Sequence, residues 1–399
     1  MSDLNRLLGQ AEGVTAPDLW PDIRGRQPRQ HPERRTGVAL VALGLAAAGL
    51  VLAAMAFLGE PESRRRTPAA TPLDVDPRVT AEIDLGQFPQ EVAAGAGAVW
   101  VTVNEADPIE RWYVARIDPA TNEVTDEVQI QEPQDVAVGG GNVWVVGVDV
   151  DTGSAVFRLD ATGRIVDSIS LDCVRECYPS QIAATSDAVW VTASRAYPEW
   201  GEVIRIDPSS GTVTGRTRVP GDPRDLVVGE GGVWVYSLTH FTQQSVSGGT
   251  LYRLDPETSE VVATLLEGRI PPASGVNGPP VLAAGFGSVW SSVAPGKPIP
   301  LGDDETSIVQ IDPSTNQLVG DPIPLGTLFL PFSDEAGGVW FRGGAEDAEP
   351  LISRLDPITR TVQDSFRINA TVLDGAIDPG TSTMWLTTYE GAVLRVDLR

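Results

Sequence analysis

Seven times along the chain, a segment of small residues runs into a tryptophan that follows valine or methionine. Successive tryptophans lie 44, 46, 44, 56, 50 and 45 residues apart. A repeat of this length is typical of one four-stranded propeller blade. The spacing therefore predicts an all-β fold, a seven-bladed β-propeller with one tryptophan per blade: Trp100, Trp144, Trp190, Trp234, Trp290, Trp340 and Trp385.

The unit at 133–170 indicates how one blade is built. Four apolar runs, at 135–138, 143–148, 155–160 and 164–170, are separated by turn residues, which predicts four short strands. The runs are almost continuously apolar, as expected for strands covered on both faces by neighbouring blades. Because a tryptophan recurs in every unit, each is interpreted as packing between blades.

The last unit stops early. Residues 391–399 match a third strand, and the chain then ends. The missing fourth strand has its match at 78–85, ahead of the first complete unit. The propeller, assigned to 78–399, is therefore expected to close by pairing an N-terminal strand with C-terminal ones, which leaves no open sheet edge.

The direction of the strands sorts the loops into two faces. Loops between the second and third strands, and crossovers to the next blade, share one face, here called the long-loop face. The tighter turns share the other, the short-turn face. Long irregular segments concentrate on the long-loop face, which is the predicted working surface. The N-terminal strand is expected to enter from the short-turn face.

Charge is distributed very unevenly. The chain carries 29 basic and 54 acidic side chains, and residues 1–78 hold ten of the bases and nine of the acids. The propeller is thus left with a charge near −26. Such a surface repels nucleic-acid phosphates, so no nucleic-acid partner is expected.

An uncharged run of 22 residues at 37–58 is long enough to span a bilayer as a helix. Five arginines lie shortly before it and three shortly after it, which favours an N-terminus inside the cell. The prediction is a cytoplasmic, mostly disordered tail at 1–36, a single-pass anchor in the cell membrane and an extracytoplasmic linker at 59–77. The alternative is a cleaved signal peptide.

The tail contains an apolar cluster at 16–23 within a proline-rich setting. It is either a disordered tail with scattered apolar residues or a docking motif for a cytoplasmic partner. Over about 25 residues the tail resembles those of actinobacterial single-span proteins that accompany sigma factors.

An aspartate recurs after the third strand of each unit, usually before proline, and an arginine usually lies two residues earlier. These aspartates fit turns in which the side chain bonds its own backbone. The arginines are interpreted as contacts within or between blades, with Gln310 in their place in the fifth unit.

Four acidic residues lie at or near one level of the innermost strands, beside the channel mouth: Glu91, Asp135, Asp225 and Asp374. Oxygen ligands gathered there are suited to a hard cation, Ca²⁺ or Mg²⁺, the candidate cofactor. The alternative is that these acids are solvated strand starts.

Aromatic residues and one histidine fall on or near the long-loop face. They form the candidate binding surface for a protein or small-molecule ligand, with loop packing as the alternative. The set is Trp112, Tyr197, Trp200, His240, Phe241 and Tyr389.

The two cysteines, Cys173 and Cys177, lie in the crossover between the second and third blades. Outside the cytoplasm, a pair this close is expected to form a disulfide that staples the loop.

The recurring pattern at 287–317, Gly-Ser-Val-Trp followed by Ile-Asp-Pro-Ser-Thr-Asn-Gln, resembles the YVTN/virginiamycin B lyase-like seven-bladed propellers. The resemblance covers 78–399. The resemblance implies the propeller fold. The resembling family includes streptogramin lyases, which use histidines and a divalent metal. The propeller here has one histidine, His240, which argues against that mechanism.

The function expected first is therefore a non-catalytic ligand- or protein-binding module, a sensor or scaffold displayed outside the membrane. The second is an extracytoplasmic metal-dependent lyase or hydrolase of the streptogramin-lyase-like type. The third is a structural envelope protein. No P-loop, dinucleotide fingerprint or nucleophile elbow is present, and no catalytic residue is assigned.

Overall fold

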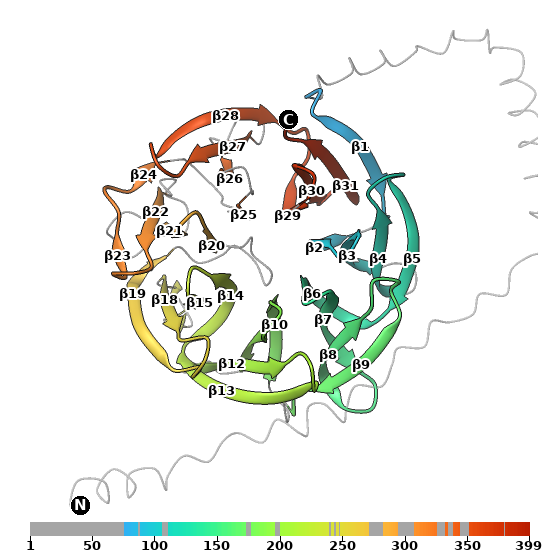
Figure 1. The fold of residues 1–399 in the computed structure, drawn as a ribbon, viewed down its shortest axis with the longest axis horizontal. Helices are drawn as coiled ribbons and strands as arrows, with labels where there is room; N and C mark the ends of the chain where they lie inside the picture. The colour runs from blue at the N-terminus through green and yellow to red at the C-terminus, as the bar shows by residue number, and fades with distance from the viewer. Residues whose placement is uncertain are drawn as a thin grey trace, which may run out of the picture. The chain divides into compact units, whose positions relative to one another are not determined.

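Seven small antiparallel sheets stand around a ring in the computed structural model (Figure 1). The structure describes residues 76–86, 88–105, 111–172, 177–195, 200–238, 241–242, 245–246, 248–270, 282–293, 307–324, 332–333, 338–343, 351–378 and 380–399. Each sheet is one blade, and its strands follow chain order from the centre of the ring outwards, except in the last blade.

The first three blades have four strands each. Blade 1 contains β2 (Pro89–Gly95), β3 (Ala98–Glu105), β4 (Arg111–Asp118) and β5 (Glu123–Gln129). Blade 2 contains β6 (Gln131–Gly139), β7 (Asn142–Asp149), β8 (Gly153–Leu159) and β9 (Ile165–Ser170). Blade 3 contains β10 (Cys177–Ala184), β11 (Val189–Arg195), β12 (Trp200–Asp207) and β13 (Thr212–Pro220).

Blade 4 contains β14 (Asp222–Gly229), β15 (Gly232–Leu238), β18 (Gly249–Leu254) and β19 (Val261–Ile270), with a small hairpin of β16 (Phe241–Thr242) and β17 (Ser245–Val246) between β15 and β18. Blade 5 contains β20 (Leu282–Gly285), β21 (Ser288–Val293) and β22 (Ser307–Asp312). Its outer edge is split into β23 (Gln317–Leu318) and β24 (Ile323–Pro324), which both pair with β22.

Blade 6 contains β25 (Phe332–Ser333), β26 (Val339–Gly343), β27 (Leu351–Asp356) and β28 (Thr361–Arg367). Blade 7 contains β29 (Val372–Asp378), β30 (Thr383–Thr388) and β31 (Ala392–Asp397), and its outermost strand is β1 (Val79–Asp84) from the start of the propeller. The seven-bladed all-β architecture predicted from the tryptophan spacing is confirmed.

Ring closure by the N-terminal strand is also confirmed. β1 runs antiparallel to β31, with Val79 opposite Val396 and Asp84 opposite Ala392. The amide of Asp397 donates to the carbonyl of Arg78 at 2.8 Å, and the amide of Leu85 donates to the carbonyl of Gly391 at 3.0 Å. Both edges of β31 are therefore paired, and the chain enters the ring at the short-turn face.

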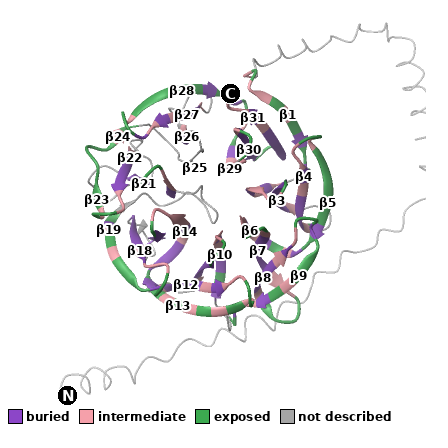
Figure 2. Cartoon of the chain, viewed as in Figure 1, coloured by how far each residue is buried: buried purple, intermediate pink, exposed green. Residues whose placement is uncertain are grey.

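The core lies between blades. All seven repeat tryptophans are at most 2% exposed, and the apolar clusters combine residues of adjacent blades, as when Trp144 of β7 packs with Val191 of β11. Exposed residues gather on the outermost strands (Figure 2), where β13 alternates between exposed and covered positions. An inner strand is covered on both faces, which explains why its sequence is almost continuously apolar. An outer strand is covered on one face only, which explains the alternation of covered and exposed residues.

The recurring arginines join neighbouring blades. In six blades the guanidinium lies 5.0–6.0 Å from the repeat tryptophan ring, on the neighbouring strand. Arg158 Nη1 also donates at 2.8 Å to the carbonyl of Pro208, in the next blade. Arg395 does the same to Pro119 across the closure, at 2.9 Å. These contacts confirm the architectural interpretation.

The recurring aspartates form the expected turns. Asp207 Oδ1 accepts the amide of Ser209 at 2.7 Å, and Asp160 Oδ1 accepts that of Thr162 at 2.9 Å. Hydrogen bonds from the hydroxyls of Ser209 and Thr162 lower the pKa values of Asp207 and Asp160, each to about 2.

Within the part of the chain that the structure describes, no helix is long and apolar enough to cross a membrane. The predicted tail, anchor and most of the linker lie outside the described residues.

Candidate functional site

All four acids predicted at the channel lie within the inner strands, and three of them reach across to the next blade. Asp135 Oδ2 in β6 accepts the amide of Ile182 in β10 at 2.7 Å. Asp225 Oδ2 in β14 accepts the amide of Leu282 in β20 at 2.9 Å. Asp374 likewise accepts an amide of the next blade, across the ring closure. These three side chains are 5–8% exposed, so they are not the solvated strand starts of the alternative interpretation.

Asp374 Oδ2 in β29 accepts the amide of Val92 in β2 at 2.8 Å. The receiving strand β2 has a register irregularity between Pro89 and Val92, and β10 has one between Pro179 and Ile182. A bulge takes an amide out of its own ladder, and a buried amide must find another acceptor. The aspartate of the preceding blade supplies it.

A second amide at this level is satisfied by a threonine of the second strand. The amide of Glu91 donates to Thr102 Oγ1 at 3.0 Å, and that of Asp374 donates to Thr387 Oγ1 at 3.0 Å. Both threonines are fully buried. The aspartates and threonines thus hold the irregular stretch of the inner strands in place.

The carboxyl groups share one electrostatic environment. Burial raises the pKa of Glu91 and Asp135 well above the usual range, and the charge of Asp374 raises both further. Burial also raises the pKa of Asp374, to about 6, against the opposing effect of its hydrogen bond from Val92. Glu91, which is half-buried, hydrogen-bonds to Asp374, so these two acids meet at the closure.

Among the described residues, no three His, Cys, Asp or Glu side chains are arranged to hold a metal ion. Asp135 and Asp225 each bond two backbone amides, since their Oδ1 atoms accept the following amides, of Val136 and Leu226, at 2.6 Å. What these groups do in the structure is join blades; the Ca²⁺ or Mg²⁺ site stays a prediction.

Three of the predicted ligand-binding residues have described side chains. Tyr389, in the loop between β30 and β31, is 61% exposed and contacts Phe88 edge-to-face at 5.9 Å between ring centroids. Trp200 starts β12 and lies 4.0 Å from the guanidinium of Arg218. Trp112 is half-buried near the start of β4. The three come from blades 1, 3 and 7.

The structure describes only part of the remaining predicted residues. The backbone of Phe241 starts β16, which pairs with β17. Tyr197, His240 and Cys173 lie outside the described residues. Cys177 is disulfide-bonded, and Cys173 is the one other cysteine in the sequence.

Arg342 on β26 is a residue that sequence reasoning missed. It lies two residues after Trp340, where three other blades place Thr102, Thr192 and Thr387. Its Nη1 donates to the carbonyl of Val372 in blade 7 at 2.7 Å, and burial lowers its pKa while Glu390 opposes that shift. A charged residue at this position of the repeat is the signal that could have identified it.

No protein-family model and no curated protein matches the sequence. Among solved structures, the chain is similar to Kuenenia stuttgartiensis hydrazine synthase, with a TM-score of 0.56 and 12% identity over 77% of this chain and 95% of that chain. It is also similar to the Pan2 WD40 domain of Neurospora crassa, with a TM-score of 0.53 and 10% identity over 80% of this chain and 96% of that chain. At these identities the likeness shows the fold alone: the chain is a β-propeller.

Proposed function

We propose that the chain is a membrane-anchored, extracytoplasmic propeller of the YVTN/virginiamycin B lyase-like type, which binds a protein or small-molecule ligand without catalysis. In this proposal residues 1–36 are the cytoplasmic tail and 37–58 the single-pass anchor. Propellers commonly serve binding or scaffolding, and the chain resembles such folds. No nucleic-acid partner is expected, because the propeller is strongly acidic.

The observation that carries the proposal is the place where the chain enters the ring. Val79 pairs with Val396 at the short-turn end of blade 7, so in this proposal the linker joins the ring at that end and the long-loop face is the one offered to a ligand. That face displays Tyr389 at 61% exposure and Tyr178 at 58%. Tyr389 lies in a loop and Tyr178 at the start of β10, and exposed aromatic residues at the rim of a rigid scaffold are suited to recognition.

Binding is favoured over catalysis because of how the acids are used. Asp135, Asp225 and Asp374 hold backbone amides of the next blade. Their removal would be expected to disturb the ring itself. The propeller also has His240 as its one histidine, whereas the lyase mechanism of the resembling family uses several.

Location is tested with the full chain in cells. A reporter at the C-terminus that is active only outside the cytoplasm should be active, an N-terminal tag should resist external protease, and the chain should stay with membranes after a carbonate wash. An inactive C-terminal reporter, or full release by the wash, would contradict the proposed topology or anchoring.

Binding is tested by cross-linking the full chain in intact cells and comparing the captured partners between variants. Tyr178→Ala combined with Tyr389→Ala should abolish a specific partner, because these side chains form the proposed surface. Ile358→Ala is the matched control: Ile358 is 89% exposed in the turn between β27 and β28 on the short-turn face. Equal capture by both variants would contradict the assignment of the face.

A second candidate is a metal-dependent lyase or hydrolase at the channel. Burial raises the pKa values of Glu91, Asp135 and Asp374, and repulsion between the carboxyl groups adds to it. This repulsion favours the candidate, since repelling carboxylates gain from a shared cation. Calorimetry with Ca²⁺ and Mg²⁺ tests it, using Asp135→Asn with Asp225→Asn against His240→Ala. Absence of binding to the wild type excludes the candidate.

A further inference from the structure

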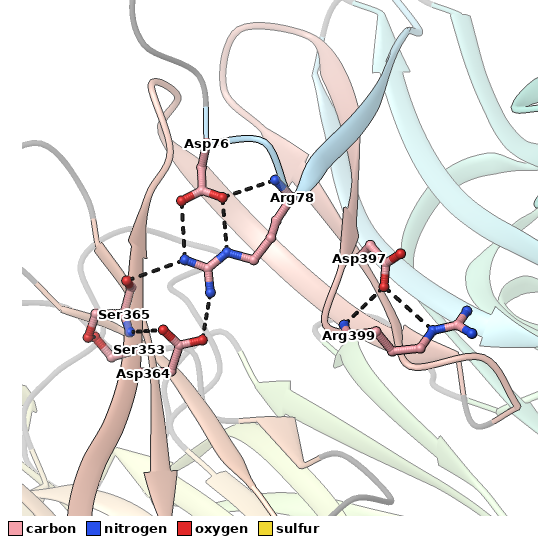
Figure 3. A network of polar contacts seen from close by, with 7 residues as sticks. All are labelled: Asp76, Arg78, Ser353, Asp364, Ser365, Asp397 and Arg399. Carbon is pink, nitrogen blue, oxygen red and sulfur yellow. Dashed lines mark hydrogen bonds and ion pairs between the residues drawn. The ribbon is translucent and has the colours of Figure 1, made fainter.

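Arg78 lies immediately before the closing strand and contacts blade 6 as well as its own segment (Figure 3). Its Nη1 donates to Asp364 Oδ2 of β28 at 2.6 Å, and its Nη2 donates to the carbonyl of Ser365 at 3.4 Å. On the other side, Nε donates to Asp76 Oδ1 at 2.9 Å and Nη2 to Asp76 Oδ2 at 3.1 Å. The guanidinium is thus held between two carboxylates from distant parts of the sequence.

The contact with blade 6 reaches the core. The Arg78 guanidinium lies 4.2 Å from the centroid of the Phe366 ring. Phe366 is 2% exposed and packs edge-to-face on Trp340, with ring centroids 6.0 Å apart. Asp364 is itself fixed, since its Oδ1 accepts the amide of Ser365 at 2.8 Å.

These contacts lie at the end of the closing ladder where its register is irregular. The register of β1 against β31 is irregular between Val79 and Ala81, at the end where the chain enters. A bulge interrupts ladder hydrogen bonds, so beyond the bond between Asp397 and Arg78 the ladder is interrupted close to the end from which the strand would peel. Arg78 adds charge-assisted hydrogen bonds and a cation–π contact at that end.

We propose that Arg78 is a clasp that fixes the start of β1 to blade 6 and keeps the ring closed when the chain is pulled from the residues that precede it. β1 would then be held by two blades, by the β31 ladder on one side and by the Asp364–Phe366 surface on the other. The source of such a pull, a membrane tether, rests on the proposed function; the clasp itself does not.

The direction of a pull decides how the ladder is loaded. When the N-terminus is pulled against a point on the long-loop face, the pairs between β1 and β31 are loaded together in shear. When it is pulled against the C-terminus, both strands are held at the same end and the pairs separate one after another. The clasp lies at the end that this peeling reaches first.

Hydrogen exchange of the full chain tests the clasp at rest. Arg78→Gln and Asp364→Asn should each speed exchange of the β1 amides about tenfold, the loss expected from charge-assisted bonds, and the double variant should add little to either. Arg78→Lys, which keeps the charge and loses the planar fork, should fall between. Asp364→Asn keeps the test usable if the Arg78 variants fold poorly, because Asp364 is 49% exposed.

Arg399→Gln is the matched control. Arg399 pairs with Asp397 at the same end of blade 7, and its contacts stay within that blade (Figure 3). It should leave β1 exchange unchanged. The proposal would be overturned if the β1 amides of Arg78→Gln exchanged at the wild-type rate, or if Arg399→Gln accelerated their exchange equally.

Single-molecule pulling tests the clasp under load. The full chain in a detergent micelle is held at its N-terminus and either at a Val150→Cys handle, which is 83% exposed in the β7–β8 loop, or at its C-terminus. Arg78→Gln should lower the opening force, most of all in the second geometry. Unchanged opening forces in both geometries would refute the clasp. Neither test depends on where the chain resides, so failure of the clasp and failure of the proposed anchoring are distinguishable.

Discussion

At the residue scale, the acidic position of the innermost strands makes one of two contacts, depending on the blade. Asp135, Asp225 and Asp374 each reach a backbone amide in the next blade. Glu91 is longer by one methylene and bonds Asp374 instead. Gln181 replaces the acid in blade 3. The short aspartate is the form whose oxygen reaches the amide of the inner strand in the following blade.

Asp225→Asn should destabilise the propeller by about 1–3 kcal/mol, because the amide group can accept only one of the two buried backbone N–H groups that Asp225 now bonds. Urea unfolding of the purified chain measures the change. Asp187→Asn, at an exposed position, is the control and should be neutral. Equal midpoints for the two variants would show that the bridging bonds contribute nothing.

Gln310→Arg should stabilise the chain by roughly 0.5–2 kcal/mol, the range of a cation–π contact. In blade 5, Gln310 is buried opposite Trp290, and its Oε1 has no hydrogen-bond partner. An arginine there would restore the contact that the other six blades make. A rise in melting temperature is the expected readout, with Arg253→Gln as the reverse change; a fall on Gln310→Arg would mean that blade 5 is too altered to accept it.

At the element scale, the outer strands are the variable part of the blades. Blade 5 divides its outer edge between β23 and β24, and blade 7 borrows β1 from the other end of the propeller sequence. Outer strands tolerate this because they are covered on one face only, as their exposed positions show (Figure 2). The second strand of each blade, which is covered on both faces, keeps the regular tryptophan and apolar pattern.

Removal of residues 78–86 should unfold or oligomerise the propeller, because it exposes the edge of β31 that β1 now pairs. The comparison is between fragments 87–399 and 70–399, by thermal melting and by light scattering. Equal melting temperatures and equal monomer content would mean that closure by β1 adds no stability.

At the scale of the whole molecule, two sets of carboxyl groups set opposite pH dependences. The turn aspartates have lowered pKa values, about 2 for Asp160 and Asp207, so their contribution is lost as the pH falls below about 4. The channel acids have raised values, about 6 for Asp374 against an ordinary value of 3.8. The contribution of Asp374 is complete below pH 3.8 and is lost as the pH rises through 6.

The free energy of unfolding should therefore be highest near pH 4–5 and fall towards pH 7. The net charge of −25 adds to the fall through self-repulsion. Asp374→Asn should reduce the decrease in the free energy of unfolding between pH 4 and 6, because Asp374 contributes to that decrease. Urea titrations over pH 3–8, at concentrations low enough to avoid precipitation near the pI of 4.4, measure it. A stability that rises steadily to pH 7 would contradict the raised pKa values.

The sequence by itself determined the blade number, the closing strand and the architectural role of the repeated arginines and aspartates. Each of these follows from periodicity, because a residue that recurs once per blade occupies the same local environment every time. Trp100 and Arg116, for instance, are fixed by their own blade and its neighbour.

What Asp135, Asp225, Asp374 and Arg342 do was decided only by the tertiary structure. Their partners, such as Ile182 and Val372, belong to the next blade, and two of the amides that the aspartates accept lie at register irregularities of β2 and β10 that no residue pattern marks. The same holds for Arg78 and Asp364, which lie far apart in the sequence and meet because the ring closes. A contact between blades depends on the angle and register at which two sheets pack, and those are properties of the assembled ring.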